Sequence, residues 1–118
     1  MLEHALKFAV MGWHVFPCHS IFEKQNGLMC TCKNIGCSSP GKHPLTPNGL
    51  TNATTDPEWI KAWWQKWPHA NIAILTGAPS GIIALDIDPK NDGSNSLNDL
   101  TDKYGPLPHT VTSITGSG

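Results

Sequence analysis

The pattern of hydrophobic and polar positions predicts an irregular middle segment between regions of regular secondary structure. Apolar residues recur at helical spacing over residues 2–11, and Gly12 is a plausible end for that helix. The next stretch, "WHVFP", is typical of a short strand that ends at Pro17. Residues 18–54 show no periodicity and carry many Gly, Pro, Ser and Cys residues. A structureless stretch of that length is unusual in a compact domain, so we expect a clamp to hold it.

The second half of the chain alternates between predicted helices and strands. The clearest helix lies in "TTDPEWIKAWWQKWP", where Asp56 or Thr55 can cap the first turn and Pro68 ends the helix. Two strands joined by the glycine-rich "TGAPSG" are predicted to form a β-hairpin. The other predicted elements are a strand over residues 71–75, its hairpin partner over 82–88, a helix over 92–105 and a last strand over 110–115.

Aromatic residues form a stripe along the predicted helix that precedes Pro68. Trp59, Trp63 and Trp67 recur every four residues, next to Ile60 and Trp64. Rows of aromatic side chains can stack on single-stranded bases. A broad apolar stripe on a helix is more often part of the core, and we expect that role here, with room for one exposed tryptophan at the edge.

Composition and charge narrow the class of protein. The 118 residues are enough for one small domain. A formal net charge of −1, with lysine as the only cationic residue besides histidine, gives no support for nonspecific nucleic-acid binding by charge alone. No apolar run is long enough to span a membrane, and the first residues lack a signal-peptide pattern. We therefore expect a cytoplasmic protein whose four cysteines are not disulfide-bonded.

A cluster of soft ligands lies within the irregular segment, in "CTCKNIGCSSPGKHP". Its members are Cys30, Cys32, Cys37 and His43. Three thiolates and one imidazole suit tetrahedral zinc, and a complete set of four protein ligands indicates a structural ion. The alternative is a loop of free thiols, which would be easily oxidised. Cys18 is expected to be a small buried residue, and His19 is a spare ligand in place of His43.

Two aspartates end the predicted strand "IIALDID" and raise three interpretations. A calcium-binding loop does not fit, because Asn91 and Leu97 stand where that loop needs Gly and Glu. A simple turn explains Asp88 but not Asp86, which falls inside a strand where Asp is disfavoured. On one face of a strand, the two carboxylates could instead hold two Mg²⁺ or Mn²⁺ ions for phosphoryl transfer. The residues alone leave the last two interpretations open.

Taken in order, the segments resemble a known family. They are "WHVFPCHS", "CTCKNIGCSSPGKHP", "TNATTDPEWIKAWWQKWPHANIAILTG", "SGIIALDIDPKNDG" and "GPLPHTVTSITGSG". The chain is similar to the N-terminal part of the bifunctional DNA primase/polymerase domain of plasmids, phages and integrated elements, in the archaeo-eukaryotic primase superfamily. The resemblance covers nearly the whole chain, and the run from Thr51 to Gly93 is its most specific part.

The resemblance implies roles for individual residues. Asp86 and Asp88 would be catalytic ligands of Mg²⁺ or Mn²⁺. The cysteine–histidine loop looks like a structural zinc-binding insertion, spanning about residues 18–47 of one domain over 1–118. The residues that the resemblance places near the nucleotide are Lys42, Asn71, Thr76, Gly77 and Ser80.

The resemblance also implies a fold, an activity and partners. The fold would be α/β (α+β): a small mixed β-sheet flanked by helices, with a zinc-stapled loop. The activity would be nucleotidyl transfer in plasmid- or phage-type DNA replication, with nucleoside triphosphates, a single-stranded DNA template and a C-terminal helicase region of the parent protein as partners. Family members continue beyond "TGSG" with a histidine and another acidic ligand, so we expect this chain to be an inactive fragment. The alternative is a zinc-stabilised module that binds single-stranded DNA or a replication partner without catalysis.

Overall fold

A computed structural model describes residues 1–25 and 27–114 of the chain. The chain divides into two compact units, Met1–Ile83 and Ala84–Gly118. Three α-helices and two antiparallel pairs of strands make up the regular structure of the described residues. This arrangement confirms the predicted mixed class of helices and small sheets.

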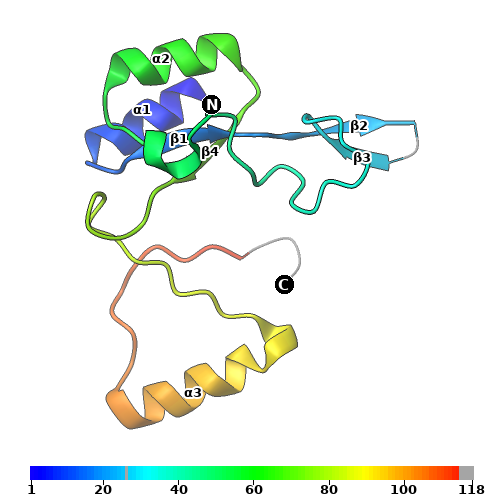
Figure 1. The fold of residues 1–118 in the computed structure, drawn as a ribbon. Helices are drawn as coiled ribbons and strands as arrows, with labels where there is room; N and C mark the ends of the chain where they lie inside the picture. The colour runs from blue at the N-terminus through cyan, green and yellow to red at the C-terminus, as the bar shows by residue number, and fades with distance from the viewer. Residues whose placement is uncertain (26, 115–118) are drawn as a thin grey trace. The chain divides into compact units, whose positions relative to one another are not determined.

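The first unit contains a two-stranded sheet and two helices (Figure 1). Strands β1 (Val15–Cys18) and β4 (Asn71–Ile74) pair antiparallel, with Cys18 opposite Asn71 and Val15 opposite Ile74. Helices α1 (Leu2–Val10) and α2 (Pro57–Lys66) contact each other and both contact β1. All four elements lie where the sequence predicted them.

The core of this unit forms between the helices and the sheet. Ala5, Val15, Ile60, Trp64 and Ala70 are buried together. The indole N–H of Trp64 donates to the carbonyl oxygen of Ala70 at 3.2 Å, so the buried polar edge of the ring has a partner. Trp59 is 60% exposed. The tryptophan stripe is therefore mainly core, with one edge tryptophan in solvent, as the helical spacing predicted.

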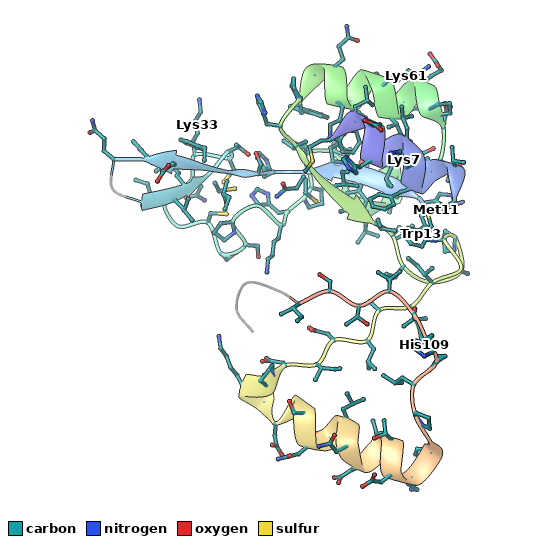
Figure 2. All side chains as sticks on the ribbon, turned by 180° about the vertical axis from the view of Figure 1, so that it is seen from behind. Lys7, Met11, Trp13, Lys33, Lys61 and His109 are labelled. Atoms are coloured by element: carbon teal, nitrogen blue, oxygen red, sulfur yellow. The ribbon has the colours of Figure 1, made fainter. Side chains whose placement is uncertain are left out.

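A side-chain cap explains where α2 begins, and charged residues cover the exposed surfaces of α1 and α2. Asp56 is the N-cap, and its Oδ1 accepts a hydrogen bond of 2.8 Å from the backbone N–H of Glu58. On the exposed side, Lys61 pairs with Glu58 at 2.8 Å. Lys7 of α1 and Lys61 of α2 are labelled in Figure 2, and their side chains are 66% and 55% exposed, as expected for solvated helix faces.

A second pair of strands, β2 (Ile21–Lys24) and β3 (Gly27–Cys30), lies in the segment that showed no periodicity. The hairpin extends away from the β1–β4 sheet in Figure 1. Every residue of β2 is exposed, and Cys30 is the only buried residue of β3. The sequence did not predict this hairpin. Apolar and polar residues alternate along a strand only when one of its faces is buried, and almost no side chain of this hairpin is buried. A short 3₁₀ helix, η1 (Gly49–Asn52), follows later in the segment.

The second unit contains a 3₁₀ turn, η2 (Pro89–Asn91), and the predicted last helix, α3 (Gly93–Tyr104). The strand predicted over residues 82–88 is wrong. Only an isolated bridge between Gly77 and Ile82 forms there, and residues 83–88 have no regular structure. The last predicted strand is likewise absent over 110–114, while Thr115 lies outside the described residues.

The two missing strands have a common physical reason. A strand needs a hydrogen-bonded neighbour, because its backbone groups have no partners within the strand itself. No described residue of 84–114 is buried, and Leu85 and Ile114 are 59% and 90% exposed. The apolar side chains that led us to predict both strands are therefore not packed against other residues in the described part of this unit.

Candidate functional site

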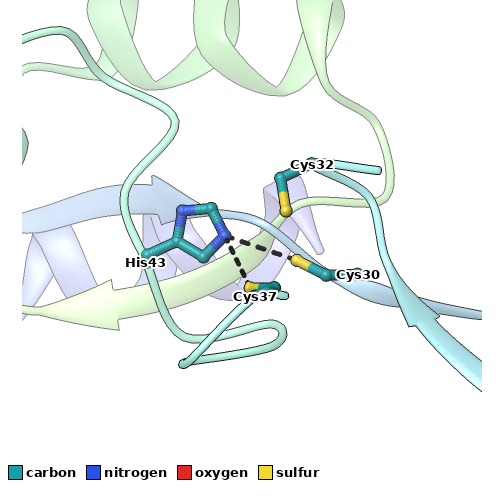
Figure 3. A group of neighbouring side chains, drawn as sticks. All are labelled: Cys30, Cys32, Cys37 and His43. Atoms are coloured by element: carbon teal, nitrogen blue, oxygen red, sulfur yellow. Dashed lines mark hydrogen bonds between the residues drawn. The ribbon is translucent and has the colours of Figure 1, made fainter. Parts of the chain in front are cut away.

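The cysteine–histidine cluster is assembled from the end of the β2–β3 hairpin and the loop that follows it. Cys30 is the last residue of β3, Cys32 lies in the turn after it, and Cys37 and His43 come from the loop. Figure 3 shows the ring of His43 directed at Cys30 and Cys37. These four residues are the ones that the sequence predicted as ligands.

The dimensions of the cluster suit a tetrahedral ion. Its four ligand atoms all lie within 4.8 Å of one another. Nε2 of His43 lies 3.4 Å from Sγ of Cys30 and 3.6 Å from Sγ of Cys37. Tetrahedral zinc with bonds of about 2.3 Å to sulfur would place its ligand atoms about 3.7 Å apart. The cluster is therefore a candidate zinc site, and its donor set fits a closed, structural ion.

The surroundings of the cluster lower the pKa of one cysteine, Cys30, and raise that of another, Cys37. Burial by itself would raise the pKa of the Cys30 thiol, but hydrogen bonds from Cys32, Gly41 and His43 outweigh it and lower the pKa to about 6. For Cys37, the backbone N–H of Ser39 favours the thiolate, but burial and the neighbouring cysteines prevail and raise the pKa. Cys30 would therefore offer a metal ion a thiolate, whereas Cys37 would have to lose its proton on binding.

Gly41 and Asn71 connect the loop to the sheet. The N–H of Gly41 donates to Sγ of Cys30 at 3.4 Å, and its carbonyl oxygen accepts from Nδ2 of Asn71 at 2.9 Å. Gly41 has φ +72°, and a Cβ there would lie 3.2 Å from Cγ2 of Ile21. Both the left-handed backbone and the close packing therefore favour glycine.

Two of the predicted nucleotide-binding residues share one hollow in the first unit. Lys42 and Asn71 both line an open hollow of about 410 Å³, together with Gly41 and the edge of the β1–β4 pair. The side chain of Lys42 is exposed, so its ammonium group is available to a ligand. Nδ2 of Asn71 is engaged by Gly41, which leaves its amide oxygen as the group that can face the hollow.

The other predicted nucleotide-binding residues lie at the opposite end of β4. Five residues of extended chain from Asn71 to Thr76 correspond to about 16 Å. Gly77 has φ +89°, and its N–H donates to the carbonyl oxygen of Ile82. Ser80 is buried, and its hydroxyl accepts from the backbone N–H of His14 at 2.9 Å. The described geometry therefore gives Ser80 a role in fixing the turn and separates this group from Lys42.

The predicted catalytic aspartates belong to the second unit. Both side chains are exposed, in residues without regular secondary structure. Asp88 caps η2: its Oδ1 accepts from the N–H of Lys90 at 3.0 Å and its Oδ2 from Nδ2 of Asn91 at 2.7 Å. The argument that a strand directs both carboxylates to one face fails, because the strand is absent. Their role as metal ligands remains a prediction.

The structure also places Cys18 and His19, the two neighbouring residues that the sequence offered as spare ligands. Cys18 is buried in β1 and burial raises its pKa, so it is a packed thiol as predicted. His19 is not among the four ligands; its ring lies against that of His43 instead. Burial and the neighbouring His43 lower the pKa of His19. Sequence reasoning missed this contact and the bridge between Asn71 and Gly41, because neither leaves a signal in local spacing.

Among the described residues, no helix is long and apolar enough to cross a bilayer. Searches of curated proteins and of solved structures find no significant match. A family model described as bifunctional DNA primase/polymerase, N-terminal, matches residues 5–118. That match spans every predicted site residue and nearly the entire sequence, so the chain belongs to the bifunctional DNA primase/polymerase family.

Proposed function

We propose that this chain forms part of a DNA-directed nucleotidyltransferase in which Asp86 and Asp88 hold catalytic Mg²⁺ or Mn²⁺. The observation that carries the proposal is the family match over residues 5–118, which includes both aspartates. Membership supports a DNA primase/polymerase-type function that binds nucleotides and DNA. A plasmid or phage context and a helicase region in the same protein remain predictions from the resemblance.

The proposed reaction is transfer of a nucleotide to a 3′-hydroxyl. The hydroxyl oxygen attacks the α-phosphorus of a nucleoside triphosphate, a new phosphodiester bond forms, pyrophosphate leaves and the hydroxyl proton passes to solvent. Bound divalent ions supply charge neutralisation at the attacking and leaving oxygens. The exposed carboxylates of Asp86 and Asp88 are accessible to such ions, and η2 fixes the carboxylate of Asp88 through Lys90 and Asn91.

Nucleotide contacts are proposed for Lys42, Asn71, Thr76, Gly77 and Ser80. Support is strongest for Lys42 and Asn71, because they line the same hollow. An ammonium group is a suitable partner for a phosphate, and the amide oxygen of Asn71 can accept from a sugar or base. Lys42→Ala is expected to weaken binding of a nucleoside triphosphate to the chain, as measured by NMR chemical-shift titration. Lys33→Ala, which removes an exposed lysine outside that hollow, is the matched control.

Zinc bound by Cys30, Cys32, Cys37 and His43 is proposed to be structural. Four protein ligands leave no open coordination position for substrate. The expected role is to hold the loop that carries Lys42 beside Asn71. Elemental analysis should find about one zinc per chain in protein purified without chelator. A content well below that would remove this part of the proposal.

The catalytic assignment is tested in two steps. Mn²⁺ should broaden the NMR signals around Asp86 and Asp88 of this chain, and Asp86→Asn with Asp88→Asn should abolish that broadening. Asp99→Asn with Asp102→Asn, which removes two exposed carboxylates of α3, is the control. In a longer protein that carries this domain, the first pair should abolish primer extension and the control pair should not.

The 118-residue chain alone is expected to show no primer extension. Among the described residues, the cysteine–histidine cluster is the only group of three or more His, Cys, Asp or Glu ligands that converge. Asp86 and Asp88 thus have no third acidic ligand in that part of the chain. Robust incorporation of nucleotides by the isolated chain would contradict this expectation. Binding of single-stranded DNA without Mn²⁺ binding at the aspartates would favour the non-catalytic module instead.

A further inference from the structure

The ring of His19 lies directly against the ring of His43. The two ring centroids are 4.2 Å apart and the ring planes are inclined by 29°, which is a stacked arrangement. The backbones are joined at the same place, because the N–H of His19 donates to the carbonyl oxygen of His43 at 2.9 Å. His19 follows β1 directly, so it connects the β1–β4 sheet to a predicted metal ligand.

Thr31 contacts the Nδ1 edge of the His19 ring. Its hydroxyl oxygen accepts from the backbone N–H of Ser20 at 3.0 Å and lies 2.9 Å from Nδ1 of His19. A hydroxyl has one donor hydrogen and two acceptor lone pairs, so Thr31 can donate to Nδ1 of His19 or accept from it while still accepting from Ser20. In either tautomer the contact restricts rotation of the His19 ring.

The second ring nitrogen of His43 has no protein partner among the described residues. A ligating histidine usually donates its second ring N–H to a carboxylate, a carbonyl or water, which orients the ring. Among the described residues, no hydrogen bond engages Nδ1 of His43; those of its ring are made by Nε2, with Cys30 and Cys37. Among the described residues, the stacked ring of His19 is therefore a protein contact that can orient the His43 ring where no protein hydrogen bond to Nδ1 does.

We propose that His19 is a positioning residue of the metal centre, whose ring, anchored by Thr31, keeps Nε2 of His43 directed at the cysteine thiols. The inference rests on the proposed zinc site and adds to it a residue that is not a ligand. The contribution of His19 lies in the face of its ring and not in metal coordination. An aromatic ring without nitrogen should therefore replace it in large part.

The test uses the full 118-residue chain with Co²⁺ as a spectroscopic probe and Zn²⁺ in competition. His19→Ala should weaken binding of both metals about 10–100-fold, the range typical of residues that orient a ligand. It should also change the visible d–d bands of Co²⁺, because the His43–metal geometry becomes less defined. His19→Phe keeps the ring face but loses the contact with Thr31, and Thr31→Val loses the same contact. Both variants should therefore bind Co²⁺ more weakly than the unmodified chain and more tightly than His19→Ala. His69→Ala, which changes an exposed histidine elsewhere, is the control.

Each alternative outcome can be distinguished. If the unmodified chain binds neither metal, the zinc site itself is refuted and the inference with it. If it binds metal but His19→Ala matches it in affinity and spectrum, only the inference is overturned. A loss in His19→Phe as large as in His19→Ala would also overturn it, because a nitrogen and not the ring face would then matter. Should His19→Ala fail to fold by circular dichroism, His19→Phe and Thr31→Val decide the question by the same criteria.

Discussion

Removing the metal is expected to unfold residues 19–44 while the rest of the first unit stays folded. Within this segment, Cys30 and Gly41 are the only buried residues among those described. A two-stranded hairpin is marginally stable by itself in water. The segment therefore has too little buried apolar surface to offset the entropy of ordering its backbone, and the metal is expected to supply the difference.

The size of the effect follows from linkage between binding and folding. When free zinc exceeds its dissociation constant 1000-fold, binding stabilises the metal-bound form by about 4.1 kcal/mol, or roughly 1000-fold in the opening equilibrium. The N–H of Thr31, bonded to Ser20 at 2.9 Å, reports on the segment. The N–H of Val15, bonded to Thr54 at 2.9 Å, reports on the core. Chelation should accelerate exchange of the Thr31 amide by about that factor and change the Val15 amide far less.

Hydrogen exchange followed by NMR, with zinc and with a strong chelator, measures both amides in one sample. Cys37→Ser should exchange like the chelated protein even when zinc is present. Cys18→Ser is the matched control, because Cys18 is a buried thiol outside the cluster, so the difference made by zinc should persist. Equal exchange of the Thr31 amide with and without metal would refute the reasoning that the ion holds this segment.

Four further substitutions test the fold around the sites. Ile60→Ala removes a side chain with 0% exposure, and should lower the free energy of unfolding by about 2–5 kcal/mol in urea titrations. Trp59→Ala, on the exposed edge of the same helix, should cost at most about 1 kcal/mol, and equal losses would contradict the assigned core. Asp56→Ala removes the cap of α2 and should cost about 1 kcal/mol in the same assay, whereas no change would show that the cap is dispensable. Gly93→Ala would place a Cβ 2.7 Å from the backbone nitrogen and oxygen of Asp88, so NMR shifts at Asp88 and the start of α3 should move. Unchanged shifts there would show that the close turn does not exist.

The secondary structure of the first unit was predictable wherever burial imposes a period on the sequence. Helix α2 is the clearest example. Asp56 marks its N-terminus as a capping residue, and Ile60 and Trp64, which lie on its predicted apolar face, are buried. The β2–β3 hairpin was not predictable by the same means, since its exposed residues carry no apolar period. The strand predicted over 82–88 is absent for the opposite reason. Its apolar run is typical of a buried strand, but an apolar run does not by itself supply the neighbouring strand that must pair with it.

The candidate ligands of the proposed metal site could be identified from the sequence because they lie close together along the chain. Cys30, Cys32, Cys37 and His43 need only a local loop to converge, and their thiol and imidazole groups are distinctive metal ligands. The amino-acid sequence by itself thus determined the candidate ligand set, the principal helices and, through its ordered segments, the family. The tertiary structure alone decided that His19 stacks on His43 and that Asn71 bonds Gly41, thirty positions away along the chain. Such contacts depend on how separate elements pack, and the packing of distant residues leaves no period or spacing in the sequence of either partner.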